Sequence, residues 1–219
     1  MPAPVVIIGG SGHGLDTYWL AEACGREVVG FLDDGDRAPG AMILDRPWLG
    51  PIAECVRRPD LERGHVELVV AIGNPRVRRA VVARLEARGA PRFATLVHPS
   101  VPIGRFVTLG PGCMITAGAQ LTIDVVVGAH GIVNLNTTIA HNARLGAFVT
   151  LAPMVAISGN AVLGDGVEVG TGACVRQGLT LGAGAMLGMG GVLTRALPPD
   201  ELHVGNPARF MRALPPWHG

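Results

Sequence analysis

Residues 145–192 divide into eight six-residue blocks, each beginning with an aliphatic residue: LGAFVT, LAPMVA, ISGNAV, LGDGVE, VGTGAC, VRQGLT, LGAGAM and LGMGGV. The same phase holds without an insertion from Val97 to Leu193. An α-helix has a period near 3.6 and an ordinary strand a period near 2, so neither explains a strict period of six. A six-residue repeat is typical of a parallel β-helix, in which three repeats close one triangular coil.

The repeat also predicts which residues face the interior. The aliphatic residue of each block is expected to point into the prism, and the residue four places later is usually small or β-branched. Glycine often follows the aliphatic residue, and we expect it where the corner needs unusual φ and ψ angles. These glycines are Gly104, Gly110, Gly128, Gly146, Gly164, Gly170, Gly182 and Gly188.

The segment before the repeat has a different pattern, in which short apolar runs alternate with helical stretches. Such alternation predicts a parallel sheet of Rossmann type, here about half the usual size. Asn74 is expected to cap the second helix, with Pro75 in its first turn. The expected strands are 5–8, 28–32, 68–72 and 93–97, and the expected helices are 15–24 and 75–88.

These two patterns predict a chain of α/β plus β class. We expect a small Rossmann-like domain over residues 1–96 and a parallel β-helix over 97–198. Residues 199–219 are expected to form a tail that caps the last coil and frays after Leu214. The coils carry only four arginines and three acidic residues, so we expect one or more prism faces to be buried against other subunits.

Composition narrows the partners and the compartment. The net charge is +1, which gives no reason to expect nucleic acid or an anionic membrane surface as a partner. No run is long enough to span a bilayer, and the first residues lack the pattern of a secretory signal. The cysteines show neither CxxC nor zinc-site spacing. We interpret them as reduced thiols of a cytoplasmic protein: Cys24, Cys55, Cys113 and Cys174.

A glycine-rich turn, residues 9–14, follows the first expected strand. It departs from the dinucleotide pattern because Leu15 stands where the third glycine would be. Its backbone N–H groups should still face an anion at the start of a helix. Asp33 and Asp34 end the second strand, where an acidic residue can bind a ribose or a base edge. The turn predicts nucleotide binding of some kind, and the alternative is a tight turn beside a solvated acidic strand end.

Among the histidines, His141 has the most unusual surroundings. It lies two residues after the inward Ile139, in the polar stretch NLNTTIAHNARLG of residues 134–146. The residues alone leave two interpretations open, a catalytic histidine and a hydrogen-bonded surface histidine. His130 and His141 are eleven residues apart and so do not stack one coil apart at eighteen, which argues against a shared zinc site. No metal is expected.

Five motifs in order along the chain resemble those of the bacterial sugar-nucleotide N-acetyltransferases of the left-handed β-helix superfamily. They are the glycine-rich turn, the segment around His141, and residues 30–34 (GFLDD), 71–74 (AIGN) and 204–209 (VGNPAR). The resemblance covers nearly the whole chain. It implies a left-handed β-helix and a cytoplasmic homotrimer that transfers acetyl from acetyl-CoA to the 4-amino group of a nucleotide-linked deoxysugar, for surface polysaccharide such as lipopolysaccharide O-antigen.

The resemblance favours GDP-perosamine as the sugar nucleotide, with UDP-linked 4-amino sugars as the main alternative. A sugar O-acetyltransferase of the same fold would need a stronger base, because a hydroxyl group is a poorer nucleophile than an amine. A non-catalytic hexapeptide scaffold would have no reason to combine a nucleotide-type turn with a polar histidine segment.

The resemblance also implies roles for particular residues. His141 is the expected general base, but Asn142 stands where many members of the family have Glu or Asp, so charge assistance to the imidazole is in question. The Gly159 N–H is expected to face the thioester oxygen. The expected contacts of the nucleotide sugar are Ser11, Gly12, His13, Asp33, Asp34, Gly73 and Asn74. Those of acetyl-CoA are Thr150, Gly159, Thr171, Met189, Pro207 and Arg209.

Overall fold

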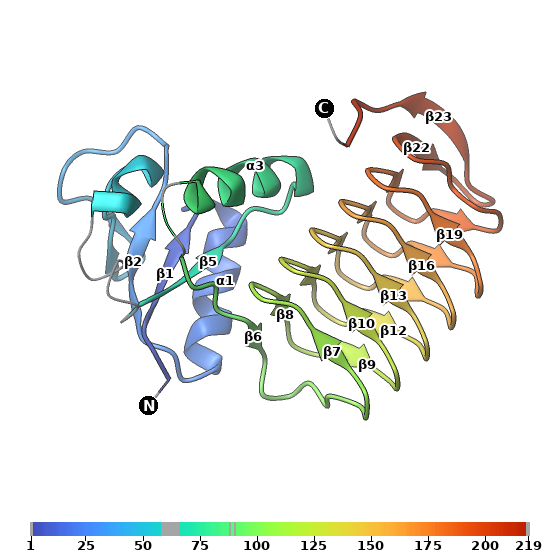
Figure 1. Ribbon diagram of the computed structural model, residues 1–219, viewed down its shortest axis with the longest axis horizontal. Coiled ribbons are helices and arrows are strands. Elements are labelled where there is room, and N and C mark those ends of the chain that lie inside the picture. Colours follow the sequence, from blue (N-terminus) through green and yellow to red (C-terminus); the bar gives the residue numbers. More distant parts are fainter. Residues whose placement is uncertain (1, 58–65, 88, 90, 218–219) are drawn as a thin grey trace. The chain divides into compact units, whose positions relative to one another are not determined.

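The computed structural model describes residues 2–57, 66–87, 89 and 91–217 (Figure 1). The chain divides into two compact units. The first comprises Met1–Gly73 and Val77–Leu96, and the second comprises Asn74–Arg76 and Val97–Gly219. Among the described residues, no helix combines the length and the apolar character needed to cross a membrane.

The first unit is built on a three-stranded parallel sheet in the order β2-β1-β5. The central strand β1 is fully buried along its length, which explains its uninterrupted aliphatic sequence. The strands are β1 (Val5–Ile8), β2 (Val28–Leu32) and β5 (Glu67–Val70), and the helices are α1 (Gly12–Ala23) and α3 (Pro75–Glu86). The smaller elements are β3 (Met42–Ile43), β4 (Arg46–Pro47) and the 3₁₀ helix η1 (Ile52–Arg57).

The helices and strands of this unit agree with the expected ones to within two residues at most ends, and two differences are larger. Helix α1 begins at Gly12, three residues before the expected start, because the glycine-rich turn itself supplies the first helical turn after Ser11. The expected strand 93–97 is split into a single bridge between Phe93 and Leu68 and the short strand β6 (Leu96–Val97). The predicted cap is confirmed, since Asn74 Oδ1 accepts the Arg76 N–H at 3.0 Å.

The second unit is a left-handed parallel β-helix with three sheets, whose successive coils follow one another from green to red in Figure 1. The first sheet contains β7 (Thr108–Leu109), β10 (Val126–Val127), β13 (Arg144–Leu145), β16 (Val162–Leu163) and β19 (Thr180–Leu181). The second contains β6, β8 (Met114–Ile115), β11 (Ile132–Val133), β14 (Thr150–Leu151), β17 (Glu168–Val169), β20 (Met186–Leu187), β22 (Glu201–Val204) and β23 (Arg209–Ala213). The third contains β9 (Gln120–Leu121), β12 (Thr138–Ile139), β15 (Ala156–Ile157), β18 (Cys174–Val175) and β21 (Val192–Leu193).

The aliphatic series fills the prism as predicted. Every member from Ile115 to Leu193 has at most 3% of its surface exposed. The residues four places later, such as Ala143 and Val149, form a second buried ladder. The prediction is wrong for Ile103, which is 46% exposed. Ile103 meets the third sheet only through a single bridge to Leu121, and no earlier rung of that sheet covers it.

The reason we gave for the glycine after the aliphatic residue is wrong. None of these glycines has a positive φ; instead, a methyl group at Gly164 would lie 2.7 Å from the backbone nitrogen of Ala183. Glycine is therefore needed so that successive coils can approach. Positive φ falls on the third residue after each aliphatic residue, at every sixth position from Phe106 to Gly190.

The C-terminal segment is packed on the coils as far as Trp217, beyond the expected point of fraying. The antiparallel hairpin β22–β23 continues the second sheet, and Trp217 is only 4% exposed. The indole lies against Gly166, where any side chain would collide with the ring, and 6.3 Å from the ring of Phe148. The expectation of fraying after Leu214 is therefore wrong, because the corner glycine provides a place for the indole.

Three of the four cysteines have described side chains. Cys24, Cys113 and Cys174 are in the thiol form. The side chain of Cys55 lies outside the part of the chain that the structure describes.

Candidate active site

The His141 corner is the edge of the prism between the third and first sheets. Its left-handed residues recur every eighteen positions, one per coil, as Asp124, Asn142, Asn160 and Gly178. Asn and Asp adopt positive φ more readily than most residues, so their side chains can replace glycine here. The Asn142 N–H donates to the Ile123 carbonyl at 3.1 Å, and the Asn160 N–H to the His141 carbonyl at 2.9 Å. These bonds hold the corner residues of neighbouring coils in line.

The imidazole of His141 is exposed at this corner and has two close neighbours. Nδ1 lies 2.9 Å from Oδ1 of Asn142. The ring lies against Gly159, one coil further on, where a methyl group would come within 2.5 Å of Cε1 and 2.6 Å of Nε2. With an amide oxygen as acceptor, Nδ1 carries the hydrogen and Nε2 can accept a proton.

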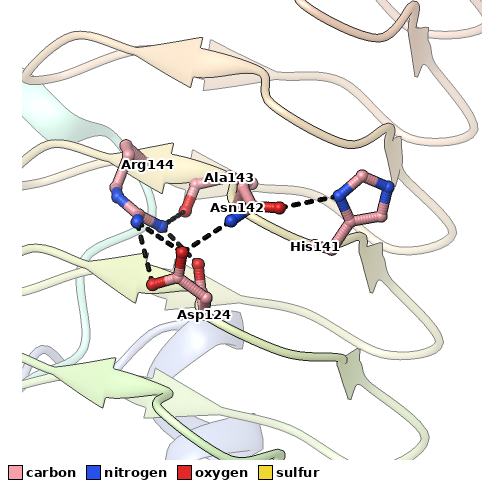
Figure 2. Close-up of polar contacts among 5 residues, drawn as sticks. All are labelled: Asp124, His141, Asn142, Ala143 and Arg144. Atoms are coloured by element: carbon pink, nitrogen blue, oxygen red, sulfur yellow. Dashed lines mark hydrogen bonds and ion pairs between the residues drawn. The ribbon is translucent and has the colours of Figure 1, made fainter.

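Asp124 and Arg144 form an ion pair next to Asn142 (Figure 2). Asn142 Nδ2 donates to Oδ2 of Asp124 at 2.6 Å, and the terminal nitrogen Nη2 of Arg144 lies 2.8 Å from both carboxylate oxygens. The other terminal nitrogen of Arg144 donates to the backbone carbonyl of Asp124. The guanidinium, and then the amide of Asn142, hold the pKa of Asp124 below its ordinary value. The carboxylate is therefore ionised at neutral pH.

Our sequence reasoning missed Asp124 and Arg144. The signal was present, because Asp124 lies eighteen residues before Asn142 and therefore one coil away at the same repeat position. Asn160 lies eighteen residues after Asn142, so Asp124, Asn142 and Asn160 form one column of corner residues, one from each coil.

In the first unit, the carboxyl ends of the parallel strands meet at one edge of the sheet, the usual place for a nucleotide in such folds. Ser11 is the exposed N-cap of α1 and makes no capping bond with its side chain. A side chain at Gly12 would meet nothing within 4 Å. Asp33 Oδ2 accepts the Gly10 N–H at 2.8 Å, so the end of β2 is tied to the glycine-rich turn.

The other expected nucleotide contacts are placed differently. Asp34 turns to η1, where it accepts the Ile52 N–H at 2.8 Å. Burial, and secondarily the charge of Arg78, lowers the pKa of His13, whose Nε2 has no hydrogen-bond partner among the described residues. Arg78 is fully buried and donates to the Gly73 carbonyl at 2.9 Å, which holds the loop after β5.

The expected acetyl-CoA contacts fall into separate groups. Thr171 and Met189 stack in successive coils at the corner after the second sheet, where the Gly190 N–H donates to the Thr171 carbonyl at 2.9 Å and Met189 is 79% exposed. Pro207 and Arg209 belong to the hairpin above this corner. Thr150 is only 7% exposed on β14 and lies at neither corner. Gly159 alone lies beside His141, so a single chain does not bring these residues together.

Comparison with known proteins identifies the family. The PglD N-terminal domain family matches residues 4–85. Over nearly the full length, the chain is 33% identical to a mutant of perosamine N-acetyltransferase from Caulobacter crescentus, solved in complex with CoA and GDP-perosamine. That match covers 97% of this chain and 98% of the other, with a TM-score of 0.88. The chain belongs to the sugar-nucleotide N-acetyltransferases of the hexapeptide-repeat β-helix family.

Two further solved structures agree with this assignment. The acetyltransferase domain of PglB from Neisseria gonorrhoeae is 30% identical, with a TM-score of 0.86, and the match covers 96% of this chain and 100% of that domain. WeeI from Acinetobacter baumannii is 28% identical, with a TM-score of 0.85, and covers 95% and 99%. A search of curated proteins finds no match.

Membership of this family excludes one of the alternatives that the sequence left open. The chain is an enzyme, so the alternative of a non-catalytic scaffold is excluded. Two structures of the Caulobacter enzyme, both with CoA and GDP-perosamine, carry a histidine replaced by asparagine or alanine. Among the described residues of this chain, no three His, Cys, Asp or Glu side chains gather as they would around a metal ion.

Proposed function

We propose that this N-acetyltransferase moves an acetyl group from acetyl-CoA to the 4-amino group of a nucleotide-linked deoxysugar, and that GDP-perosamine is its substrate. The relative with 33% identity, solved with CoA and GDP-perosamine, supports this choice. A UDP-linked 4-amino sugar is the alternative. The reaction would take place in the cytoplasm and serve surface polysaccharide synthesis.

The observation that carries the proposal is the pairing of His141 with Gly159 at one corner. The neutral amine would attack the thioester carbonyl, forming the C–N bond and placing negative charge on the carbonyl oxygen. The Gly159 N–H donates to no acceptor in the described part of the chain and could stabilise this oxyanion. The C–S bond would then break, and the proton of the amine would pass to Nε2 of His141 or to the departing thiolate.

The nucleotide would bind at the carboxyl edge of the parallel sheet, on Ser11, Gly12 and the N-terminus of α1. Asp33 would act there by fixing the turn as well as by contacting the ligand. Gly12→Val is a clean test, because the fold has room for a side chain at this position. We expect a higher KM for the sugar nucleotide and an unchanged KM for acetyl-CoA. An equal rise of both constants would contradict this binding site.

A homotrimer would resolve the separation of the acetyl-CoA contacts. Gly159 lies at one corner of the prism, and Thr171 and Met189 lie at another. A groove between two copies of the chain could bring residues from both corners to one acetyl-CoA molecule. Sedimentation equilibrium should then give three times the chain mass of 22.7 kDa. A monomer at micromolar concentration would remove the groove between subunits.

Substrate preference is tested by following the release of the CoA thiol with a panel of acceptors. GDP-perosamine should give the highest kcat/KM, UDP-linked 4-amino sugars a lower value, and 4-hydroxy analogues no measurable rate. A higher kcat/KM with the UDP-linked sugars would replace the proposed substrate by its alternative. A reaction with the hydroxy sugars alone would indicate an O-acetyltransferase.

A further inference from the structure

We propose that Asp124 and Arg144 are positioning residues that fix the tautomer of His141 through the side-chain amide of Asn142. The inference rests on the proposed function only in giving His141 a proton to accept. Its structural basis is the row of contacts in Figure 2, which runs from Arg144 through Asp124 and Asn142 to the imidazole.

The carboxylate of Asp124 decides which way the amide of Asn142 points. An ionised carboxylate can only accept hydrogen bonds, so the amide NH₂ must face it across the 2.6 Å contact. The amide oxygen must then face His141, where it lies 2.9 Å from Nδ1. Since an amide oxygen can only accept, Nδ1 must carry the ring hydrogen. One acceptor thus determines the position of a proton two side chains away.

Arg144 holds the carboxylate in the orientation that this requires. Its guanidinium contacts both carboxylate oxygens at 2.8 Å and also donates to the backbone carbonyl of Asp124. The side chains of Arg144 and Asp124 are 42% and 38% exposed, and ion pairs this open to solvent contribute little to stability. We therefore assign the pair to placing Asn142 rather than to holding the fold.

The consequence for His141 is a choice between its two neutral forms. A histidine side chain in water prefers to carry the hydrogen on Nε2, which would leave no lone pair there to accept a proton. The hydrogen bond to Asn142 favours the opposite form, with Nε2 unprotonated. The charge of Asp124 reaches the ring only through a neutral amide and is balanced by Arg144. The pair should therefore act by changing the populations of the two neutral tautomers.

Two variants remove the carboxylate without disturbing the corner. Asp124→Gly suits the local φ of +54°, since Gly178 occupies the same column at +70°. Asp124→Asn keeps the shape and the tolerance of positive φ but removes the charge. Asp165→Asn is the matched control. Its carboxylate accepts the Ala147 N–H at 2.8 Å on a different edge of the same prism.

The direct readout is the ¹⁵N spectrum of the His141 ring in histidine-labelled protein, with His141→Ala to assign the signals. Wild type and Asp165→Asn should show the form with hydrogen on Nδ1. Asp124→Gly should shift the population towards hydrogen on Nε2, and Asp124→Asn should give a mixture. A wild-type tautomer in Asp124→Gly, or hydrogen on Nε2 in the wild type, would overturn the proposal. This measurement needs no substrate, so it stays decisive even if the proposed acetyl transfer is not observed.

The second readout is the pH–rate profile. The ratio of two neutral tautomers does not depend on pH, so Asp124→Gly should lower kcat on the plateau above the acidic limb, where His141 is neutral. We expect a fall of about tenfold, less than the roughly 10²-fold minimum for outright loss of a general base. KM for both substrates should stay at the wild-type value. An unchanged kcat on this plateau would show that Asp124 does not act on His141 and would contradict the proposal.

Discussion

Two corners of the same prism share a left-handed backbone conformation but differ in the side chains that they carry. At the His141 corner, the left-handed positions carry Asp124, Asn142 and Asn160, and the imidazole is exposed and hydrogen-bonded. At the aromatic corner, defined by His130, Phe148 and Trp217, the imidazole of His130 is 3% exposed and stacks on Phe148 at 5.0 Å with an interplanar angle of 11°. The position of a histidine in the repeat thus leaves its role open, and the residues eighteen positions away decide it.

The largest difference in kcat between the two corners should appear when the imidazole of His141 is removed. His141→Ala should lower kcat by about 10²–10⁴, towards the lower end because Asn142 brings no charge to the ring. The loss should shrink at high pH, where the sugar amine is unprotonated without help. Acetyl-transfer rates over pH, with thermal unfolding to show an unchanged Tm, check this prediction.

The matched control is His130→Asn, since Asn tolerates the local φ of +57°. This variant should keep the wild-type kcat and lower Tm, through loss of the stacking on Phe148. Wild-type rates for His141→Ala at every pH would show that this corner is not the active site.

The aromatic corner should show the largest change in stability. Trp217→Ala removes a nearly fully buried indole and should lower the free energy of unfolding by about 3–5 kcal/mol, with kcat unchanged at temperatures where the protein stays folded. Chemical denaturation with parallel rate measurements tests this prediction. Trp19→Ala, at a site that is 45% exposed, should lower the free energy of unfolding by less than Trp217→Ala does, because it removes less buried surface. Equal effects of the two substitutions would mean that Trp217 does not fasten the C-terminal segment.

A smaller substitution at the His141 corner should lower kcat and leave the thermal stability nearly unchanged. Gly159→Ala places a methyl group 2.5 Å from Cε1 of His141, so the imidazole must move. A displacement of about 1 Å can cost roughly 10²-fold in rate, and we expect a fall in kcat of that order. The φ of Gly159 is not positive, so alanine should leave Tm nearly unchanged. Unaltered kinetics would contradict the placement of the ring against this glycine.

The smallest expected effect is a shift in pH dependence. Asn142→Asp alone would set two carboxylates side by side, where both cannot ionise. The exchange Asp124→Asn/Asn142→Asp avoids this and brings the charge next to the ring. A neighbouring carboxylate stabilises imidazolium and raises its pKa, so the acidic limb of kcat/KM should move to higher pH by about one unit. A limb that does not move would argue against His141 as the titrating group.

The sequence predicted much of this molecule because its repeat is strict. A period of six defines three sheets and two buried ladders, and eighteen-residue spacing would have revealed Asp124 below Asn142. Other features depend on contacts that no local pattern encodes. The hydrogen bond from the Gly10 N–H to Asp33 forms only because two strands end at the same edge of the sheet. The burial of Trp217 depends on the absence of a side chain at Gly166, fifty-one residues earlier. The reason for the repeat glycines was wrong because the constraint comes from the next coil and not from the local turn.

A crystal structure with CoA and GDP-perosamine tests the central claim most directly. The 4-amino nitrogen should lie within about 3 Å of Nε2 of His141, a distance that allows proton transfer. The Gly159 N–H should point to the position of the carbonyl oxygen. Binding of the sugar amine beyond hydrogen-bonding reach of His141, at another corner of the prism, would contradict the account.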